Sequence, residues 1–139
     1  MAVETRSFKM KTQGFCDIQN ITPQVSEIVQ NSKISNGYAL VFVGGSTAAV
    51  TTIEYESGVV QDLKDAIERL VPQDIVYAHD SRWGDGNGFS HVRASLLGPS
   101  EIIPFANHRL LLGTWQQIVI ADFDNNPRLR EVYVQLQGE

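Results

Sequence analysis

Apolar and polar residues alternate along much of this chain, and such alternation is typical of strands that bury one face. Other stretches are continuously apolar or rich in β-branched residues, which also favours strands. Turn residues such as glycine, asparagine and proline separate these stretches. The pattern predicts strands over residues 5–11, 15–18, 38–43, 49–55, 101–105, 109–112, 117–121 and 131–137.

Two stretches follow a helical period instead. Between residues 59 and 70 the apolar side chains fall on one face, and the charged ones fall on the others. Earlier in the chain, Thr22 can cap a helix and Pro23 suits its first turn, and apolar residues follow at spacings of three and four. Many strands with two helices predict an α+β fold, mainly an antiparallel β-sandwich, in a single domain over residues 1–139.

Composition narrows the classes of function. The chain has 139 residues and a net charge of −5, and its only local positive cluster is Arg128 with Arg130. Nucleic acid is therefore not an expected partner, because phosphate neutralisation needs clustered basic residues. No apolar run approaches the roughly 18 residues that cross a membrane, and no secretory leader is visible at the N-terminus. With Cys16 as the only cysteine, these features predict a cytoplasmic protein without a membrane partner.

The residues richest in chemistry lie in one glycine-rich segment. His79 and His91 flank a stretch that also contains Asp80, Asp85 and Asn87. Glycines let the backbone turn tightly, and imidazoles with carboxylates are the raw material of a metal site or an acid–base site. The alternative is that both histidines only hydrogen-bond to backbone groups of a loop. The spacing matches no zinc signature, and an EF-hand is excluded because its twelfth position lacks a carboxylate.

Other candidates are weaker on their own, and each has a structural alternative. The hydroxyls of Ser46 and Thr47 follow two glycines, so this turn can either cradle a phosphate or serve as a plain tight turn. Glu54 ends an apolar strand, where it is either a site carboxylate or solvent-facing. Gln116 follows a tryptophan that either stacks on a ligand or packs in the core. Arg93 either pairs with an anion or lies exposed without a special role.

Taken together, these segments resemble the YjbQ family, small proteins long uncharacterised and later described as secondary thiamine-phosphate synthases. The resemblance runs from about residue 37 to residue 139, and the order and spacing of many pieces carry it, since any single piece is weak. Its markers are residues 46–49, Glu54, Asp62, Pro72, Tyr77, His79, residues 85–88, His91, residues 94–100, residues 112–116, Asp124, Pro127, Arg128, Arg130 and Gly138.

The resemblance implies a β-rich homotrimer with a polar pocket near His91 for a phosphorylated small molecule. It also implies a weak ability to join the pyrimidine and thiazole precursors of thiamine phosphate. In that reaction pyrophosphate leaves a hydroxymethylpyrimidine, and the thiazole nitrogen takes its place. A divalent ion or Arg93 would offset the negative charge of the leaving pyrophosphate, and His91 would position or protonate this leaving group. The alternative is a non-catalytic trimer that binds a metabolite or a metal.

Two positions depart from the commonest pattern of that family. Many members have a histidine where this chain has Gly45, and many have an asparagine where it has Ile53. A three-histidine site cannot be built from the family positions here, so we expect weak or absent metal. The predicted site residues are catalytic His79, His91 and Glu54, ligand-binding Ser46, Thr47, Asn87, Arg93 and Gln116, and, for a divalent metal, His79 and His91.

Overall fold

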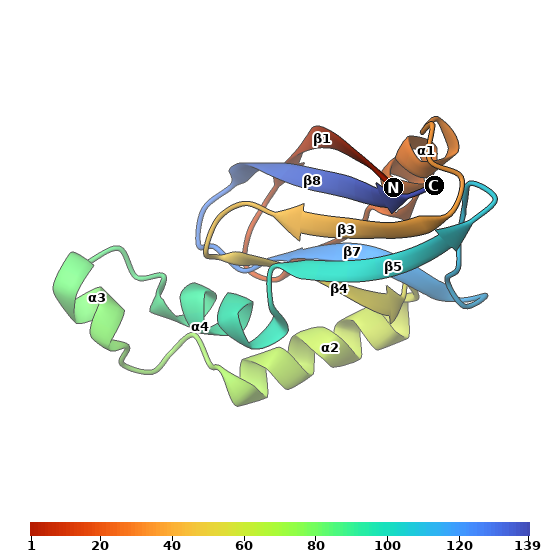
Figure 1. Ribbon diagram of the computed structural model, residues 1–139. Helices are drawn as coiled ribbons and strands as arrows, with labels where there is room; N and C mark the ends of the chain where they lie inside the picture. Colours follow the sequence, from red (N-terminus) through yellow and green to blue (C-terminus); the bar gives the residue numbers. More distant parts are fainter.

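The computed structural model describes residues 1–139 and contains eight strands and four helices (Figure 1). In chain order the elements are β1 (Ala2–Thr12), β2 (Asp17–Asn20), α1 (Thr22–Gln30), β3 (Gly37–Val43), β4 (Ala48–Glu54), α2 (Ser57–Leu70), α3 (Ala78–Trp83), α4 (Gly88–Leu97), β5 (Ser100–Ala106), β6 (Arg109–Leu110), β7 (Gln116–Asp122) and β8 (Arg128–Gly138).

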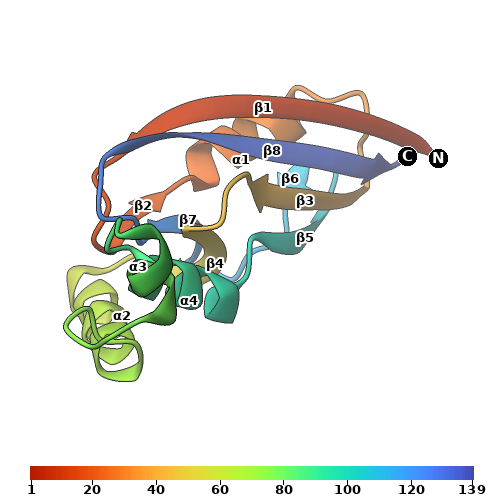
Figure 2. The ribbon, with the colours of Figure 1, turned by 90° about the vertical axis from the view of Figure 1, so that its left-hand side faces the viewer.

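The larger sheet has five strands in the order β1-β8-β3-β5-β6, and all neighbouring strands are antiparallel. Alternation along β8 explains its place, because Val132, Val134 and Leu136 are fully buried while the residues between them face outward. β1 and β8 pair along their whole length, with Ala2 opposite Gly138. The two termini therefore end side by side (Figure 2).

The smaller sheet, in the order β2-β7-β4, is buried on both faces. On one face Ile118 and Ile120 join the main core, which the larger sheet covers. On the other face Val119 and Ala121 pack with apolar residues of α2 and α4. The molecule is thus layered as the larger sheet, the smaller sheet and these two helices (Figure 1). Burial on both faces explains the continuous apolar run in β7.

The expected α+β fold with facing antiparallel sheets is confirmed, but the expected number of helices is wrong. Two further helices, α3 and α4, occupy most of the segment predicted as a glycine-rich loop. Gly84 ends α3 with a φ of 72°, and α4 begins after Asn87. The pattern missed α4 because its buried face includes the polar side chains of Ser90 and Arg93, which weaken the contrast between its faces.

The predicted strands all exist, with shifted ends. β1 and β8 extend further than predicted because each pairs with the other along its whole length, whereas β6 keeps only Arg109–Leu110. α2 begins earlier than its apolar pattern, since the Glu56 carboxylate accepts hydrogen bonds from the Gly58 and Val59 amides at 2.8 Å each. None of the helices combines the length and the apolar character that a membrane span requires.

Candidate functional site

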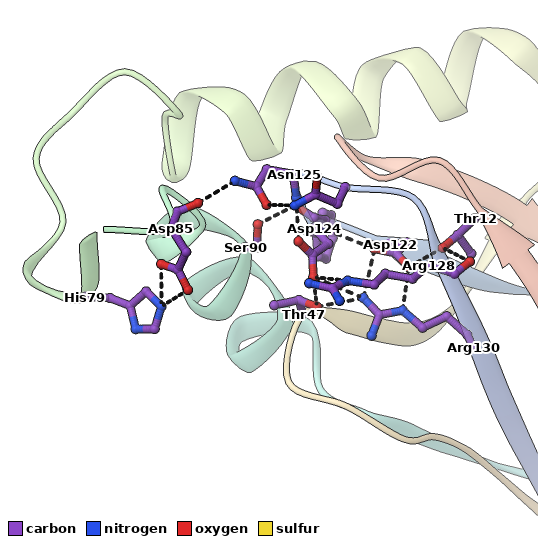
Figure 3. Close-up of polar contacts among 12 residues, drawn as sticks. Thr12, Thr47, His79, Asp85, Ser90, Asp122, Asp124, Asn125, Arg128 and Arg130 are labelled. Carbon is purple, nitrogen blue, oxygen red and sulfur yellow. Dashed lines mark hydrogen bonds and ion pairs between the residues drawn. The ribbon is translucent and has the colours of Figure 1, made fainter. Parts of the chain in front are cut away.

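Charged side chains of the β7–β8 turn and of the strand ends beside it contact one another (Figure 3). Arg130 lies on the inward side of β8, in line with Val132, and its side chain is only 9% exposed. Its Nε donates to Asp122 Oδ2 at 2.6 Å, and its Nη2 donates to Asp122 Oδ1 at 3.0 Å. Nη2 also donates to Thr47 Oγ1 at 2.6 Å. Asp122 ends β7 and is fully buried, so the two strands are joined by a bidentate ion pair.

Asp124 extends this cluster. We call Thr47, Asp122, Asp124, Arg128 and Arg130 together the arginine network. Its Oδ2 accepts hydrogen bonds from Thr47 Oγ1 and Arg128 Nε, both at 2.9 Å, and its Oδ1 accepts from the Asn125 amide at 2.7 Å. Burial raises the pKa of Asp124, but the hydrogen bonds from Arg128 and Thr47 and the Arg128 charge outweigh it, so the net pKa lies below its ordinary value. Asp124 is therefore ionised at neutral pH and holds Arg128 in position.

A cavity of about 240 Å³ opens over the arginine network, and none of its lining residues is hydrophobic. The β3–β4 turn, the start of α4 and the β7–β8 turn supply the lining, which consists of Gly45, Ser46, Thr47, Asn87, His91, Asp124, Arg128 and Arg130. Four of the residues predicted from the sequence, Ser46, Thr47, Asn87 and His91, are thus brought together. The lining offers hydroxyls, an imidazole and guanidinium groups but no apolar wall, which favours a polar or charged ligand.

The two candidate histidines lie close together, beside the turn between α3 and α4. The ring centroids of His79 and His91 are 4.5 Å apart. His79 Nε2 lies 3.1 Å from Asp85 Oδ1. The side-chain amide of Asn87 fits beside this pair when its nitrogen faces both groups, and that nitrogen then lies 3.0 Å from His79 Nε2. Asn125 joins this group to the arginine network, because its Nδ2 donates to the Asp85 carbonyl at 2.7 Å (Figure 3).

The donors that fit a divalent metal differ from the predicted pair of histidines. Ligand atoms of His79, Asp80 and Asp85 lie within 4.8 Å of one another, and His91 is not part of that group. Asp80 also accepts a hydrogen bond from the Gly88 amide at 2.8 Å, and all three side chains are at least partly exposed. One imidazole with two solvated carboxylates fits a weakly held ion rather than a closed structural zinc site.

Arg93 lies away from the cavity, which corrects its predicted role in anion binding. Its side chain is almost fully buried, and its Nε and Nη2 donate to the Val71 carbonyl at 3.0 and 2.9 Å. It forms an ion pair with Glu68 and lies over the rings of Phe89 and Phe123. The guanidinium therefore attaches α4 to the end of α2, where it satisfies the carbonyl of Val71, the residue that caps that helix.

Glu54 and Gln116 face each other across β4 and β7, at the end of the smaller sheet opposite to the cavity. The seven residues of β4 separate them from Thr47, a span of about 20 Å. Glu54 lines a different cavity of about 480 Å³ together with Trp115, which is 72% exposed and so does not pack in the core. Within one protomer, neither Glu54 nor Gln116 reaches a ligand beside His91.

Sequence reasoning did not select Asp122, Asp124, Arg128 or Arg130 as site residues. The signal was present, because Arg128 and Arg130 form the only local positive cluster, and Asp124, Arg128 and Arg130 are among the markers of the resemblance to the YjbQ family. Their spacing of two places Arg128 and Arg130 on one face of a strand. Strand pairing and the packing of the two sheets decide which face of the strand the arginines occupy. They also decide that this face lies beside Thr47.

Comparison with known proteins extends these observations. The family model described as UPF0047 protein YjbQ-like matches residues 6–139. A UPF0047 protein of Methanothermobacter thermautotrophicus is 37% identical over 139 residues, which cover 100% of this chain and 95% of that protein. The UPF0047 protein YugU of Bacillus subtilis is 32% identical over 135 residues, covering 96% and 98%.

Solved structures of other proteins share this fold. A YbjQ-like protein of unknown function from Sulfolobus solfataricus P2 superposes with a TM-score of 0.89 at 29% identity, covering 99% of this chain and 100% of the other. A hypothetical protein from Aeropyrum pernix K1 gives a TM-score of 0.90 at 32% identity, covering 98% and 99%. From its sequence and its fold, this chain belongs to the YjbQ/UPF0047 family.

Proposed function

We propose that this protein binds a phosphorylated small molecule in the cavity beside His91. The observation that supports it is the lining of that cavity, which has no hydrophobic residue and combines two guanidinium groups with hydroxyls and an imidazole. Phosphate groups are recognised by such N–H and O–H donors, and arginine suits them because its donors are fixed in a plane. The ligand proposed is therefore a small phosphorylated metabolite.

The catalytic form of the proposal is a thiamine-phosphate synthase-like reaction. The thiazole nitrogen attacks the methylene carbon of a hydroxymethylpyrimidine diphosphate, the carbon–oxygen bond breaks, and pyrophosphate leaves with the bonding electrons. Arg128 and Arg130, in place of Arg93, would take up the charge that develops on the leaving group. His91 would position or protonate the leaving oxygen. A divalent ion near His79 and Asp85 would add to this charge stabilisation.

One observation favours the alternative of a binding protein without catalysis. Glu54 and Gln116, both predicted as site residues, lie at the opposite end of β4 from the cavity. A single protomer therefore offers a phosphate-binding lining without these two side chains. Ligand binding requires only the arginine network, whereas the synthase reaction would also need the organic rings to be held.

A turnover assay with His91→Ala tests the catalytic form. The wild type is expected to form thiamine phosphate slowly from the two precursors, and His91→Ala is expected to abolish this activity, because the cavity loses its only imidazole. Product is measured by chromatography.

His108→Ala is the matched control for this assay. His108 lies outside the cavity, with its Nδ1 3.3 Å from the Val29 carbonyl. Equal activity of His91→Ala and wild type would contradict the role of His91, and no activity in any variant would favour the binding protein.

We also propose that the chain assembles as a homotrimer through the outward face of the larger sheet. Exposed apolar side chains gather there on adjacent strands, among them Phe42, Ile102 and Tyr133, and the rings of Phe42 and Tyr133 are 6.4 Å apart. Packing this face against other copies would cover these apolar side chains.

Light scattering at micromolar concentration tests the assembly. The wild type is expected at three times the chain mass of 15.4 kDa. Tyr133→Asp is expected to give monomers, because a buried unpaired charge opposes association. Leu70→Asp, at an exposed apolar position on α2, is the control and leaves the mass unchanged. A stable wild-type monomer would exclude the trimer.

A further inference from the structure

We infer that the cavity contains a phosphate subsite, in which the free edge of Arg130 and the terminal nitrogens of Arg128 bind phosphate oxygens, and that Gly45 keeps the Arg130 edge accessible. The inference rests on the proposed function and specifies the atoms that would recognise the phosphate. It assigns a ligand-binding role to Arg128 and Arg130 and a specificity-determining role to Gly45.

Arg130 has donors that no protein group satisfies. A guanidinium carries five N–H donors. The Nε and Nη2 of Arg130 engage Asp122 and Thr47, but Nη1 has no hydrogen-bond partner in the protein. The side chain is nonetheless only 9% exposed, and its Nη1 lies beside Gly45 in the cavity lining. No buried side-chain nitrogen or oxygen lacks a partner, so Nη1 is open to the cavity, from which water or a ligand oxygen can approach it.

Arg128 adds further N–H donors. It lies two residues before Arg130, on the same face of β8. Its Nε donates to Asp124, whereas its two terminal nitrogens have no partner in the protein. It lines the same cavity, and its side chain is about half exposed. Two guanidiniums that present terminal N–H groups to one space match a group with several acceptor oxygens and no donors of its own. Phosphate has this chemistry.

The two aspartates of the network orient the arginines and leave the cavity side of them free. Asp122 is fully buried, and its two oxygens already accept from Arg130, the Thr12 hydroxyl and the Asp124 amide. Asp124 accepts from Thr47, Arg128 and the next backbone amide. Because these carboxylates balance the formal charge of both arginines, recognition would rest on directed N–H donors rather than on excess positive charge.

Gly45 leaves the Arg130 edge uncovered. A Cβ built on Gly45 would lie 2.8 Å from Arg130 Nη1, closer than real Cβ contacts, and the backbone there has a φ of +113°. Any side chain at this position would therefore push the guanidinium aside or cover it, and it would also strain the turn. A glycine is what permits Nη1 to meet a ligand oxygen.

Calorimetric titration with inorganic phosphate and with pyrophosphate, in the presence of EDTA, tests the subsite in the full-length chain. The wild type is expected to bind saturably. Gly45→Ala and Arg128→Gln are each expected to weaken binding by about tenfold, the loss that follows from removing a charge-assisted hydrogen bond. Gly84→Ala is the matched control, because Gly84 also has a positive φ of +72° but nothing within 4 Å of an added Cβ. Its affinity is expected to equal that of the wild type.

The subsite would be overturned by the absence of saturable binding of either anion, or by equal affinity in wild type, Gly45→Ala and Arg128→Gln with circular dichroism showing all three folded. Binding that appears only when a divalent cation is added would also overturn it, because a metal and not the guanidiniums would then hold the anion. The turnover assay tests the proposed reaction separately. Phosphate binding without turnover leaves the subsite standing, and turnover without phosphate binding overturns the subsite alone.

Discussion

Asp122→Ala is expected to lower the free energy of unfolding by about 3–5 kcal/mol, the cost of leaving a buried charge without its partner. Arg130 is held by both oxygens of Asp122, and the side chains of both residues are nine-tenths or more buried. The same substitution removes the acceptor of the Thr12 hydroxyl and of the Asp124 amide. The loss is therefore a large part of the roughly 5–15 kcal/mol that stabilises a typical domain.

Urea denaturation measures this loss, with all variants at one protein concentration because any assembly also contributes to stability. Asp74→Ala is the control, since Asp74 is an exposed aspartate of the α2–α3 connection. The double variant Asp122→Ala with Arg130→Met is expected to be more stable than Asp122→Ala alone, because it leaves no unpaired charge. If Asp122→Ala were as stable as the Asp74→Ala control, the ion pair would contribute nothing to the fold.

Gly14→Ala is expected to cost about 2–5 kcal/mol, the sum of a left-handed backbone strain and a steric clash. Gly14 has a φ of +80°, and a Cβ built there would lie 2.2 Å from the Asp124 carbonyl oxygen. The same carbonyl accepts a hydrogen bond from the Phe15 amide at 2.7 Å. The β1–β2 connection thus packs directly against the turn that carries the arginine network, so the substitution would displace that turn.

Gly84→Ala separates the two parts of this cost. It carries the backbone strain at a φ of +72° without any contact to the added methyl group, so it is expected to lose only about 1–2 kcal/mol. Thermal and urea unfolding of both variants measure the difference. Equal losses of unfolding free energy in the two variants would show that the clash between the added Cβ and the Asp124 carbonyl oxygen is relieved at little cost. A larger loss in Gly14→Ala is the expected result.

Much of the fold followed from the sequence because alternation and helical spacing are local properties. The inward residues of β8 and the apolar face of α2 are visible as periodic patterns without knowledge of their partners. α4 is the instructive exception. Its buried face includes Arg93, whose charge is compensated by Glu68 on a different helix, and no local pattern contains that compensation.

The candidate site was predictable only in part, for the same reason. His79 and His91 lie in one segment, and a turn between two short helices brings their rings together. Gln116 and Glu54 instead pair across the smaller sheet, far from that turn, because the length of β4 separates them from it. Residue type indicated that these side chains carry chemistry, but sheet pairing decided which of them share a cavity.

By itself the sequence determined the strands, two of the helices and the segment that carries the histidines, since each depends on neighbours a few residues away. Only the tertiary structure decided the arginine network. Thr47 and Asp122 hydrogen-bond to Arg130 from a different turn and strand, and Thr12 hydrogen-bonds to Asp122 across a sequence separation of 110 positions. The β1–β8 register and the packing of the two sheets place them together. A buried arginine is stable there because the fold supplies its acceptors, which no stretch of the chain supplies locally.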